Sequence, residues 1–470
     1  MGGGRCREQG ARRAGRMCKP LAVSRPGVPT IEGLDLCHLD LFADGFPHAA
    51  FAELRREAPV WWHPPTPNTP GGEGFWCVLD HAHCLATAAD AATFSSHTGP
   101  GRDGGGTLID DLPEGFTGVL LNMTDDPLHQ RIRALLTPAL SPRAVAAMDA
   151  DLRGRARAIV AGALARGEVD LLVDVAAELP LQAAAALMGV PQEDRHLLLE
   201  WADATLDQRP DADGADSGSS AVDRAAELAG ALTDYGNALV VRRRTDPGDD
   251  LISLAATGRI STEGIQGPRT TGAGTVGAGT CGDGSTGAGN RRPLRDDEVG
   301  LLFMLLAAAG TETTRNTIAV GLAKLAAHPG DWSALAADAE LRPAAVEEML
   351  RFASSTPYNR RTATADSTLG GVEIAAGDKV VLWWASANRD PAEFPGPDRF
   401  DIRRTPNRHL AFGHGSHFCL GARLARLEIR VMLDEVLAAV ATVDALGPIE
   451  WTRSNKHTGV RHAPVRLHPR

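Results

Sequence analysis

Residues 412–426 read Phe-Gly-His-Gly-Ser-His-Phe-Cys-Leu-Gly-Ala-Arg-Leu-Ala-Arg. The stretch places one cysteine, Cys419, at the end of a glycine-bearing loop and directly before a helical pattern of apolar residues. Backbone N–H groups and the helix dipole favour negative charge at a helix N-terminus, so a thiolate at Cys419 would be stabilised there. The glycines of the loop let the backbone turn sharply and approach a large, flat group.

Two simpler interpretations remain open for these residues taken alone. Cys419 could be a buried structural cysteine in a surface turn, which is the usual role of an isolated cysteine in a glycine-rich loop. It could also form a zinc site with His414 and His417, although the stretch lacks the paired CxxC or HxxxH spacing of structural zinc sites.

The whole stretch resembles the haem-binding loop of the cytochromes P450, whose pattern is Phe-Gly-x-Gly-x-His-x-Cys-x-Gly followed by Leu-Ala-Arg. Every one of these positions is filled here. The resemblance implies that Cys419 is the axial thiolate and metal ligand of haem b. It also implies that Phe412, Gly413, His417 and Gly421 bind the cofactor. A thiolate ligand donates electron density to iron and favours cleavage of the O–O bond.

A second stretch, within residues 296–325, predicts a long apolar helix that begins with three acidic residues. A buried helix has little reason to contain glycine, glutamate and threonine together, because Gly costs about 1 kcal/mol relative to Ala. A buried carboxylate without a partner also costs free energy. A structural alternative places Glu312 and Arg315 on a solvent-facing turn.

The P450 resemblance implies another role for this helix. P450s use Ala/Gly-Gly-x-Asp/Glu-Thr to open a groove for dioxygen, and Ala309, Gly310, Glu312 and Thr313 fill those positions. Glu312 and Thr313 are then the catalytic acid–alcohol pair that relays protons, since a carboxyl and a hydroxyl group can each accept and donate.

Four basic residues are candidates for binding the haem propionates. His129 and Arg133 are four residues apart and share a helix face, which from spacing alone indicates an ordinary solvated face. The resemblance implies that both hold a propionate, together with His417 and Arg361. Because Arg360 is adjacent to Arg361, the arginine that binds the propionate could be either of the two.

Glu348 and Arg351 form a Glu-x-x-Arg pair one helical turn apart. The motif is weak by itself, because Glu53 and Arg56 have the same spacing and a surface pair contributes little stability. In the sequence, Glu348 and Arg351 lie between the helix predicted at 296–325 and Arg361. The resemblance implies that they are the buried ion pair of P450s that supports the loop before the cysteine.

The resemblance implies a mainly α P450 fold, a large helical domain with a small β-rich lobe, over residues 28–470. Residues 1–27 predict a disordered basic tail, and the low-complexity residues 267–292 predict a loop insertion that cannot bury enough apolar area to offset its ordering entropy. We expect loops at 95–118 and 208–220. Helices are predicted at 145–164, 171–188, 195–206 and 222–244, and two strands around a turn at 372–374 and 379–384.

The composition excludes several classes of protein. The chain has 470 residues, 43% of them hydrophobic, which is enough for a substantial core. A net charge of −11 gives no nucleic-acid footprint. No run of eighteen apolar residues predicts a membrane span. The seven cysteines are odd in number and irregularly spaced, which indicates a reducing, cytoplasmic location without disulfides.

The implied activity is monooxygenation of a lipophilic small molecule by a monomeric bacterial-type enzyme with O2 as co-substrate. Electrons from NAD(P)H would arrive through a ferredoxin reductase and a ferredoxin, since no flavin or iron–sulfur motif is present. The sequences of residues 311–316 and 454–465 look most like the corresponding sequences of P450s that act on steroid side chains and terpenoids. Four arginines could form a positive face that docks a ferredoxin, and they are equally consistent with an ordinary solvated face: Arg131, Arg423, Arg426 and Arg430.

Two alternative functions remain. One is a haem-thiolate enzyme for desaturation, epoxidation or oxidative coupling in secondary metabolism, which the acid–alcohol pair does not exclude. The other is a non-catalytic haem-binding sensor.

Overall fold

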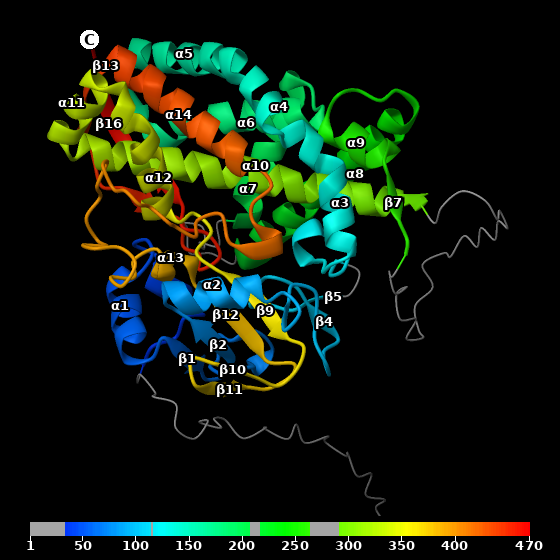
Figure 1. Ribbon diagram of the computed structural model, residues 1–470. Coiled ribbons are helices and arrows are strands. Elements are labelled where there is room, and N and C mark those ends of the chain that lie inside the picture. The colour runs from blue at the N-terminus through cyan, green and yellow to red at the C-terminus, as the bar shows by residue number, and fades with distance from the viewer. Residues whose placement is uncertain (1–32, 114–115, 207–216, 264–290) are drawn as a thin grey trace, which may run out of the picture.

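A computed structural model describes residues 33–113, 116–206, 217–263 and 291–470. A large helical lobe lies against a smaller lobe that contains most of the β-structure (Figure 1). The predicted tail 1–27 and most of the predicted insertion lie outside the described residues. The helices are α1 (His48–Glu57), α2 (His81–Ala89), α3 (Leu128–Leu136), α4 (Pro142–Ala147), α5 (Asp149–Arg166), α6 (Glu178–Met188), α7 (His196–Leu206), α8 (Ser217–Thr245), α9 (Leu251–Thr257), α10 (Asp296–Ala326), α11 (Pro329–Ala337), α12 (Arg342–Ala353), α13 (Trp384–Ala387) and α14 (Ala422–Ala439).

The 31-residue helix α10 runs through the helical lobe and is about 46 Å long at the usual rise per residue (Figure 1). Three acidic residues occupy its first turn, where the helix dipole favours them. The Glu298 carboxylate accepts a hydrogen bond from the Arg295 backbone N–H at 2.7 Å, which closes the N-terminus. Most of the later residues are buried against α6, α8, α12 and α14, so α10 is fixed from several sides.

The smaller lobe is built on a five-stranded sheet in the order β1-β2-β12-β9-β3, in which only β2 and β12 are parallel. The two parallel strands are buried throughout, as their near-continuous apolar sequence requires. Trp383, just after β12, packs against the rings of Phe51 at 4.8 Å and Tyr358 at 4.9 Å between centroids. The strands are β1 (Val60–His63), β2 (Phe75–Val78), β3 (Phe94–Ser95), β9 (Asn359–Ala363) and β12 (Lys379–Leu382).

The remaining strands form five small sheets. One of them, β13-β16-β6, joins the C-terminus to the segment between α5 and α6. The bounds are β4 (Gly104–Gly105) with β5 (Leu112–Pro113), β7 (Arg259–Ser261) with β8 (Arg291–Pro293), β10 (Ser367–Leu369) with β11 (Val372–Ile374), β14 (Glu450–Trp451) with β15 (Val460–His462), and β6 (Glu168–Asp170), β13 (Val440–Ala445) and β16 (Pro464–Pro469).

Two predicted helices have different boundaries from those expected. The helix predicted at 145–164 is divided near Met148 into α4 and α5, because Ser141 caps α4 and acidic residues begin α5. The helix predicted at 171–188 begins as a π-helix over Leu171–Ala176, where the Asp170 carboxylate accepts hydrogen bonds from two backbone N–H groups of the first turn. The α-helical form starts only with α6.

The predicted loop and insertion boundaries are also partly wrong. Helix α8 begins at Ser217, inside the loop predicted at 208–220, and residues 207–216 lie outside the described part. Arg291 and Arg292, assigned to the insertion, belong to β8, which pairs with β7. Antiparallel pairing with β7 holds these two residues in a strand. The amino-acid composition of the segment does not reveal such a pairing partner.

The two strands predicted around a turn at 372–374 and 379–384 exist but do not pair with each other. Strand β11 pairs with β10, and β12 is inserted between β2 and β9. Strand β12 ends at Leu382, and Trp384 starts α13. Strand β12 is buried within the central sheet. Packing in that sheet decides which strands it pairs with, and closeness to β11 in the sequence does not.

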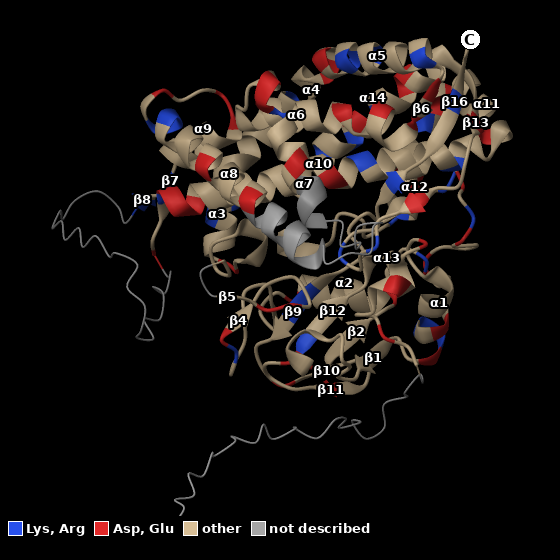
Figure 2. Ribbon diagram, turned by 180° about the vertical axis from the view of Figure 1, so that it is seen from behind, with Lys and Arg blue, Asp and Glu red and all other residues tan. Residues whose placement is uncertain are grey.

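One described stretch, Leu171–Met188, is long and apolar enough to cross a membrane by length and composition. Because 67% of it is buried inside the fold, core packing accounts for its apolar character. Basic and acidic residues are interspersed over both lobes in the back view (Figure 2).

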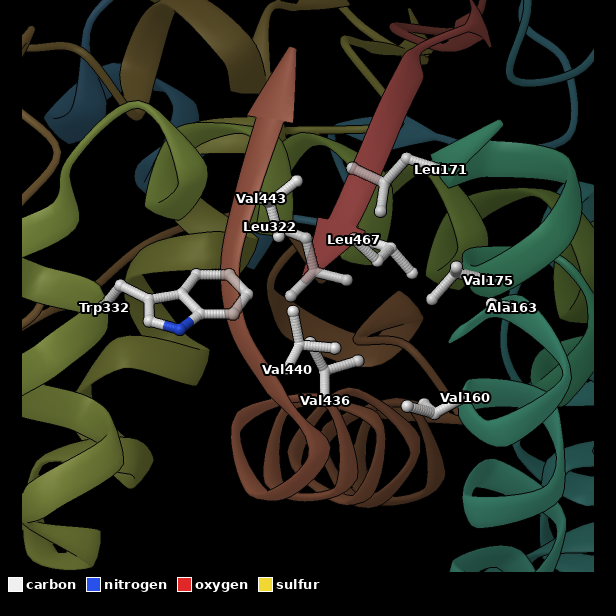
Figure 3. Close-up of a pocket in the computed structure, with 10 residues that line it drawn as sticks. All are labelled: Val160, Ala163, Leu171, Val175, Leu322, Trp332, Val436, Val440, Val443 and Leu467. Carbon is white, nitrogen blue, oxygen red and sulfur yellow. The ribbon is translucent and has the colours of Figure 1, made fainter. Parts of the chain in front are cut away.

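A small cavity of about 10 Å³ lies among α5, α10, α11 and the C-terminal strands, and ten apolar side chains line it (Figure 3). The cavity is too small and too apolar to hold a substrate or an ordered water. It is a packing defect of the helical lobe and has none of the predicted site residues in its lining.

Candidate active site

The loop before α14 lies between the two lobes (Figure 1). Gly413 and Gly415 have positive φ angles of 67° and 74°, a conformation that favours glycine. A Cβ atom on Gly415 would lie 2.3 Å from the carbonyl oxygen of Ala88 in α2, so the loop approaches α2 closely. The Cys419 backbone N–H donates to the Phe412 carbonyl oxygen at 2.9 Å. This bond closes the loop and places Cys419 three residues before α14, as predicted.

The thiol of Cys419 lacks enough positive charge around it to ionise readily. Burial raises its pKa, while a Gly421 backbone hydrogen bond and the charges of Arg133 and Arg426 oppose that rise only in part. A coordinated metal ion would add positive charge beside the thiol and favour its thiolate form.

The predicted propionate-binding residues gather around the same loop. The rings of His129 in α3 and His417 have centroids 4.1 Å apart. Burial, together with the positive charges of Arg361, His129 and Arg133, lowers the pKa of His417 to about 2. Burial also lowers the pKa of Arg361 to about 10, which Asp125 partly offsets. Four basic groups from three separate segments are thus close together.

Strand β9 decides between Arg360 and Arg361. The Arg360 side chain forms an ion pair with Asp111 at 2.7 Å, whereas Arg361 donates to the Arg360 carbonyl oxygen at 3.0 Å. Among the described residues, no carboxylate lies within ion-pair distance of Arg361 or Arg133. Adjacent strand residues point to opposite sides of the sheet, so only one of the two arginines can face this cluster.

Helix α10 has an unusual exposure pattern near its middle. Ala309 is the only exposed residue of α10 after its first turn, and Gly310 and Thr313 are half-buried beside it. The Thr313 hydroxyl donates to the Ala309 carbonyl oxygen at 3.1 Å. Three of the four predicted dioxygen-groove residues therefore retain accessible surface, whereas Glu312 is buried.

Glu312 does not lie on a solvent-facing turn, so the structural alternative for this residue is wrong. Glu312 and Arg315 are 3% and 7% exposed and form an ion pair. The Asn316 side-chain amide also donates to the Glu312 carboxylate at 2.6 Å. Thr313 and Glu312 are adjacent in the chain, but no hydrogen bond joins their side chains.

Known proteins resemble this chain over nearly its whole length. A family model described as cytochrome P450 matches residues 283–440. The cytochrome P450 126 of Mycobacterium tuberculosis is 45% identical over 444 residues, which cover 93% of this chain and 98% of that protein. The chain belongs to the cytochrome P450 family.

Other P450s match with similar coverage. A steroid C26-monooxygenase of Rhodococcus jostii is 33% identical over 94% of this chain and 86% of that protein. A linalool 8-monooxygenase of Pseudomonas putida is 33% identical over 94% of this chain and all of that protein. The solved structure of a Mycobacterium marinum cytochrome P450 in complex with pseudoionone has a TM-score of 0.78 and 32% identity over 94% of this chain and all of that one. The P450 fold and a monooxygenase family are confirmed.

P450s bind haem iron through a thiolate and use O2, and the residues present fit that group. Arg361 is a buried cation with no carboxylate partner among the described residues, which is costly, and a carboxylate of haem would supply the missing negative charge. A thiol whose pKa is raised by burial would likewise gain the cation that it lacks.

The Glu348–Arg351 pair has the buried position expected for a P450. Both side chains are completely buried and joined by two hydrogen bonds of 2.8 Å. Arg404 donates to the same carboxylate at 3.1 Å, as does Asn407 at 3.1 Å. Sequence analysis did not identify Arg404 or Asn407, because they lie 56 and 59 residues away from Glu348 and belong to no short motif.

Arg426 supports the cysteine loop from the outside. Its guanidinium lies 4.6 Å from the centre of the Phe412 ring and forms two hydrogen bonds, of 2.7 and 2.8 Å, to Glu347. Burial raises the pKa of Glu347, but hydrogen bonds from Arg426 and His409 outweigh it and lower the pKa to about 2. Glu347 therefore helps to hold Arg426 against the cysteine loop, and the sequence did not reveal this role.

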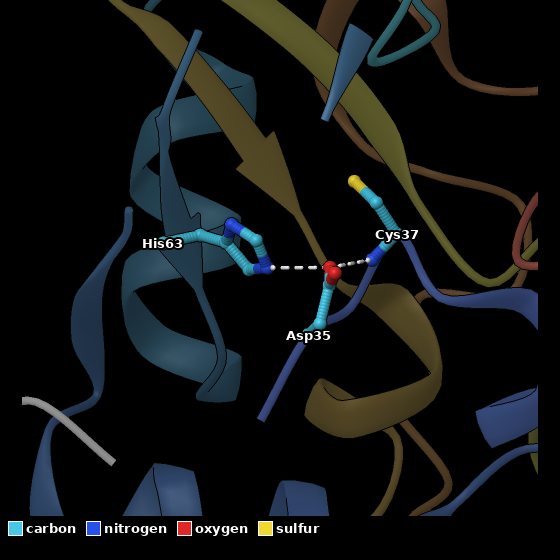
Figure 4. A group of neighbouring side chains, drawn as sticks. All are labelled: Asp35, Cys37 and His63. Carbon is cyan, nitrogen blue, oxygen red and sulfur yellow. Dashed lines mark hydrogen bonds and ion pairs between the residues drawn. The ribbon is translucent and has the colours of Figure 1, made fainter. Parts of the chain in front are cut away.

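The described residues contain one other group with metal-ligand atoms close together, namely Asp35, Cys37 and His63 (Figure 4). The His63 Nε2 atom already accepts the Leu36 backbone N–H at 2.9 Å. Asp35 accepts the Cys37 backbone N–H, also at 2.9 Å, and burial raises the pKa of the Cys37 thiol to about 12. These contacts hold the segment against β1 and leave no metal site. The zinc alternative at Cys419 likewise has no convergent ligands among the described residues.

Proposed function

We propose that the chain is a haem-thiolate monooxygenase that inserts one atom of O2 into a lipophilic substrate, with a terpenoid or steroid hydroxylation as the leading case. The observation that supports this most strongly is that basic side chains from three segments converge beside Cys419, among them the buried Arg361, which has no carboxylate partner among the described residues. The named activities of the relatives, on steroids and linalool, support the substrate class.

Cys419 would be the axial ligand, and His129, Arg133, Arg361 and His417 would hold the propionates. When bound, haem supplies the activation of O2 and the transfer of one oxygen atom. Three neighbouring residues of the loop would line the side that contacts the cofactor, namely Phe412, Gly413 and Gly421. Glu348 and Arg351 would keep this loop in place from behind.

Glu312 and Thr313 would manage protons, each starting from a defined partner. The Thr313 hydroxyl donates to Ala309 and can turn to donate into the accessible space beside it. Glu312 must exchange its contacts with Arg315 and Asn316 before it can pass a proton on. The ion pair with Arg315 and the hydrogen bond from Asn316 orient the carboxylate between turnovers.

We expect one atom of ¹⁸O from labelled O2 in the product, with NAD(P)H, a surrogate ferredoxin and its reductase as the electron source. Substrates are first found by spectral titration of the ferric protein with terpenoids and steroids. Thr313→Ala and Glu312→Gln should each lower the product formed per NAD(P)H by roughly tenfold or more and raise hydrogen peroxide release.

Thr311→Ala is the matched control for these substitutions. The Thr311 hydroxyl makes the same type of bond, to the Ala307 carbonyl oxygen at 2.8 Å, on a completely packed face of α10. Thr311→Ala should leave the coupling ratio unchanged. A product without label would contradict hydroxylation, and full coupling in both variants would contradict the proton role.

We also propose that a ferredoxin delivers the electrons at the surface outside the cysteine loop. Three of the four candidate arginines have protein partners: Arg426 with Glu347, Arg430 with Asp149 and Arg131 with the Ser261 carbonyl. Arg423 in α14 is exposed, and in the described part of the chain its side chain has no hydrogen bond or ion pair. The docking hypothesis therefore rests mainly on Arg423.

Arg423→Glu should slow reduction by ferredoxin several-fold and flatten its dependence on salt, because an exposed charge steers association. Stopped-flow reduction at several ionic strengths measures both effects. Arg242→Glu, the same charge change at an exposed position of α8, should have no such effect. Equal rates for the two variants would rule out docking at Arg423.

We further propose that residues 28–470 form one domain that works as a monomer in the cytoplasm. The described cysteines Cys37, Cys77 and Cys84 are buried free thiols, which suits a reducing compartment.

A further inference from the structure

Asp125 lies between two elements that carry the buried basic residues. It precedes α3, which holds His129 and Arg133. Strand β3 pairs with β9, so that Ser95 lies opposite Thr362, the residue after Arg361. The relative position of β3 and α3 therefore decides whether the basic groups from α3 and β9 face the same point.

The Asp125 carboxylate joins these two elements directly. One oxygen accepts the Ser96 backbone N–H at 2.8 Å, and the other accepts the Ser95 hydroxyl. The Asp125 carbonyl oxygen accepts the His129 backbone N–H at 3.0 Å. The Ser95 oxygen in turn accepts two backbone N–H groups, from His97 at 2.9 Å and Thr98 at 3.1 Å. Asp125 is thus the hub of a continuous hydrogen-bonded connection from α3 to the loop after β3.

Helix capping does not explain this arrangement. Pro127 occupies the N-cap position of α3, and no side chain caps the helix. The Asp125 carboxylate is directed to β3, so its hydrogen bonds fix one element relative to another. They do not satisfy the first turn of a helix.

Two further features connect Asp125 with the predicted propionate site. Asp125 is the carboxylate that partly offsets the effect of burial on Arg361, although the two side chains form no ion pair. The Ser96 hydroxyl, in the turn that Asp125 holds, is 1% exposed and has no hydrogen-bond partner among the described residues. A buried hydroxyl without a partner is costly, so a polar group bound within its reach would be stabilising.

We propose that Asp125 is a positioning residue for the haem. By bonding to Ser95 and Ser96, it sets β3, and through it Arg361 of β9, relative to His129 and Arg133 of α3. The inference rests on the proposed haem role of these basic residues and adds a residue whose side chain bonds to none of them.

The test is the rate at which the ferric protein transfers haem to apomyoglobin, followed by the change in the haem absorption band. Asp125→Ala removes both hydrogen bonds and should speed haem transfer by about tenfold or more. Asp125→Asn keeps an acceptor for the Ser96 N–H and should remain within about threefold of the wild type. Ser95→Ala removes one of the two bonds to Asp125, together with the acceptor for the His97 and Thr98 N–H groups, and should also speed haem transfer even if Asp125→Ala fails to fold.

Asp170→Ala is the control, because the Asp170 carboxylate also joins two segments by accepting backbone N–H groups, from Leu172, Val173 and Ala463, but lies at the β6 sheet. It should lower the urea midpoint without speeding haem transfer. Wild-type transfer rates in both Asp125→Ala and Ser95→Ala would overturn the inference. Equal acceleration by Asp170→Ala, or loss of haem from Asp125→Asn as fast as from Asp125→Ala, would overturn it too. A wild-type protein without a thiolate-type spectrum of its reduced CO complex would instead overturn the proposed function on which the inference rests.

Discussion

Replacing Cys419 by alanine is expected to abolish the thiolate-type spectrum of the reduced CO complex together with all O2-dependent product formation. Cys419 is the thiol that acts electrostatically on Arg133, within the cluster of basic groups, so no other described cysteine can take its place. Loss of the thiolate removes the electron donation that favours O–O cleavage. The CO difference spectrum and product analysis measure the two losses separately.

Cys84→Ala is the control for a general effect of removing a buried thiol. Cys84 is completely buried in α2, where its thiol donates to the Val78 carbonyl oxygen at 3.3 Å. We expect some loss of stability in Cys84→Ala and an unchanged CO spectrum. A thiolate-type spectrum that survives in Cys419→Ala would show that the assignment of the metal ligand is wrong.

Replacing Glu348 by glutamine is expected to lower the free energy of unfolding by about 3–5 kcal/mol, the usual cost of removing one partner of a buried ion pair. The carboxylate lies between the guanidinium groups of Arg351 and Arg404, and both are buried. Its neutralisation leaves two buried cations without a counter-charge. Urea unfolding, followed by circular dichroism, measures the loss.

The same substitution should also loosen the cysteine loop. Arg351 donates to the Asn388 carbonyl oxygen at 2.8 Å, and the Asn388 side-chain oxygen accepts the Leu410 backbone N–H at 2.7 Å. Leu410 in turn accepts the Gly413 N–H at 2.9 Å. A four-step connection thus runs from Glu348 to the loop that carries Cys419, and we expect faster haem loss in Glu348→Gln.

Glu53→Gln provides the matched control, since Glu53 has the same spacing to Arg56 but lies exposed on α1. The substitution should leave both the urea midpoint and the rate of haem loss unchanged. If Glu348→Gln unfolds at the same urea concentration as Glu53→Gln, the ion pair does not support the loop.

The difference between these two Glu-x-x-Arg pairs illustrates what a sequence leaves open. Spacing places both partners on one face of a helix, but it does not say whether that face meets solvent or another element. Burial of Glu348 depends on Arg404 and Asn407, which reach it from a distant segment. The same limitation applies to Glu312, for which the sequence offered a solvent-facing turn and the structure has a buried ion pair with Arg315.

The docking arginines show the same effect at the surface. Arg423 and Arg426 are equivalent in a helical pattern one turn apart. The structure separates them, because Glu347 of α12 and the ring of Phe412 engage Arg426 and leave Arg423 exposed. The partner residue Glu347 carries no mark in the sequence, so its effect on Arg426 could not be predicted.

By itself, the sequence determined the features that short segments encode: the glycine-bearing loop before α14, the acidic start and apolar length of α10, and most helix positions. These follow from backbone preferences and from the periodicity of apolar residues over a few turns. Only the tertiary structure decided which arginine of β9 faces the basic cluster, which acidic residues are buried, and how Asp125 joins α3 to β3. Each of these depends on contacts between residues far apart in the chain, where hydrogen-bond geometry and desolvation act and no local pattern records them.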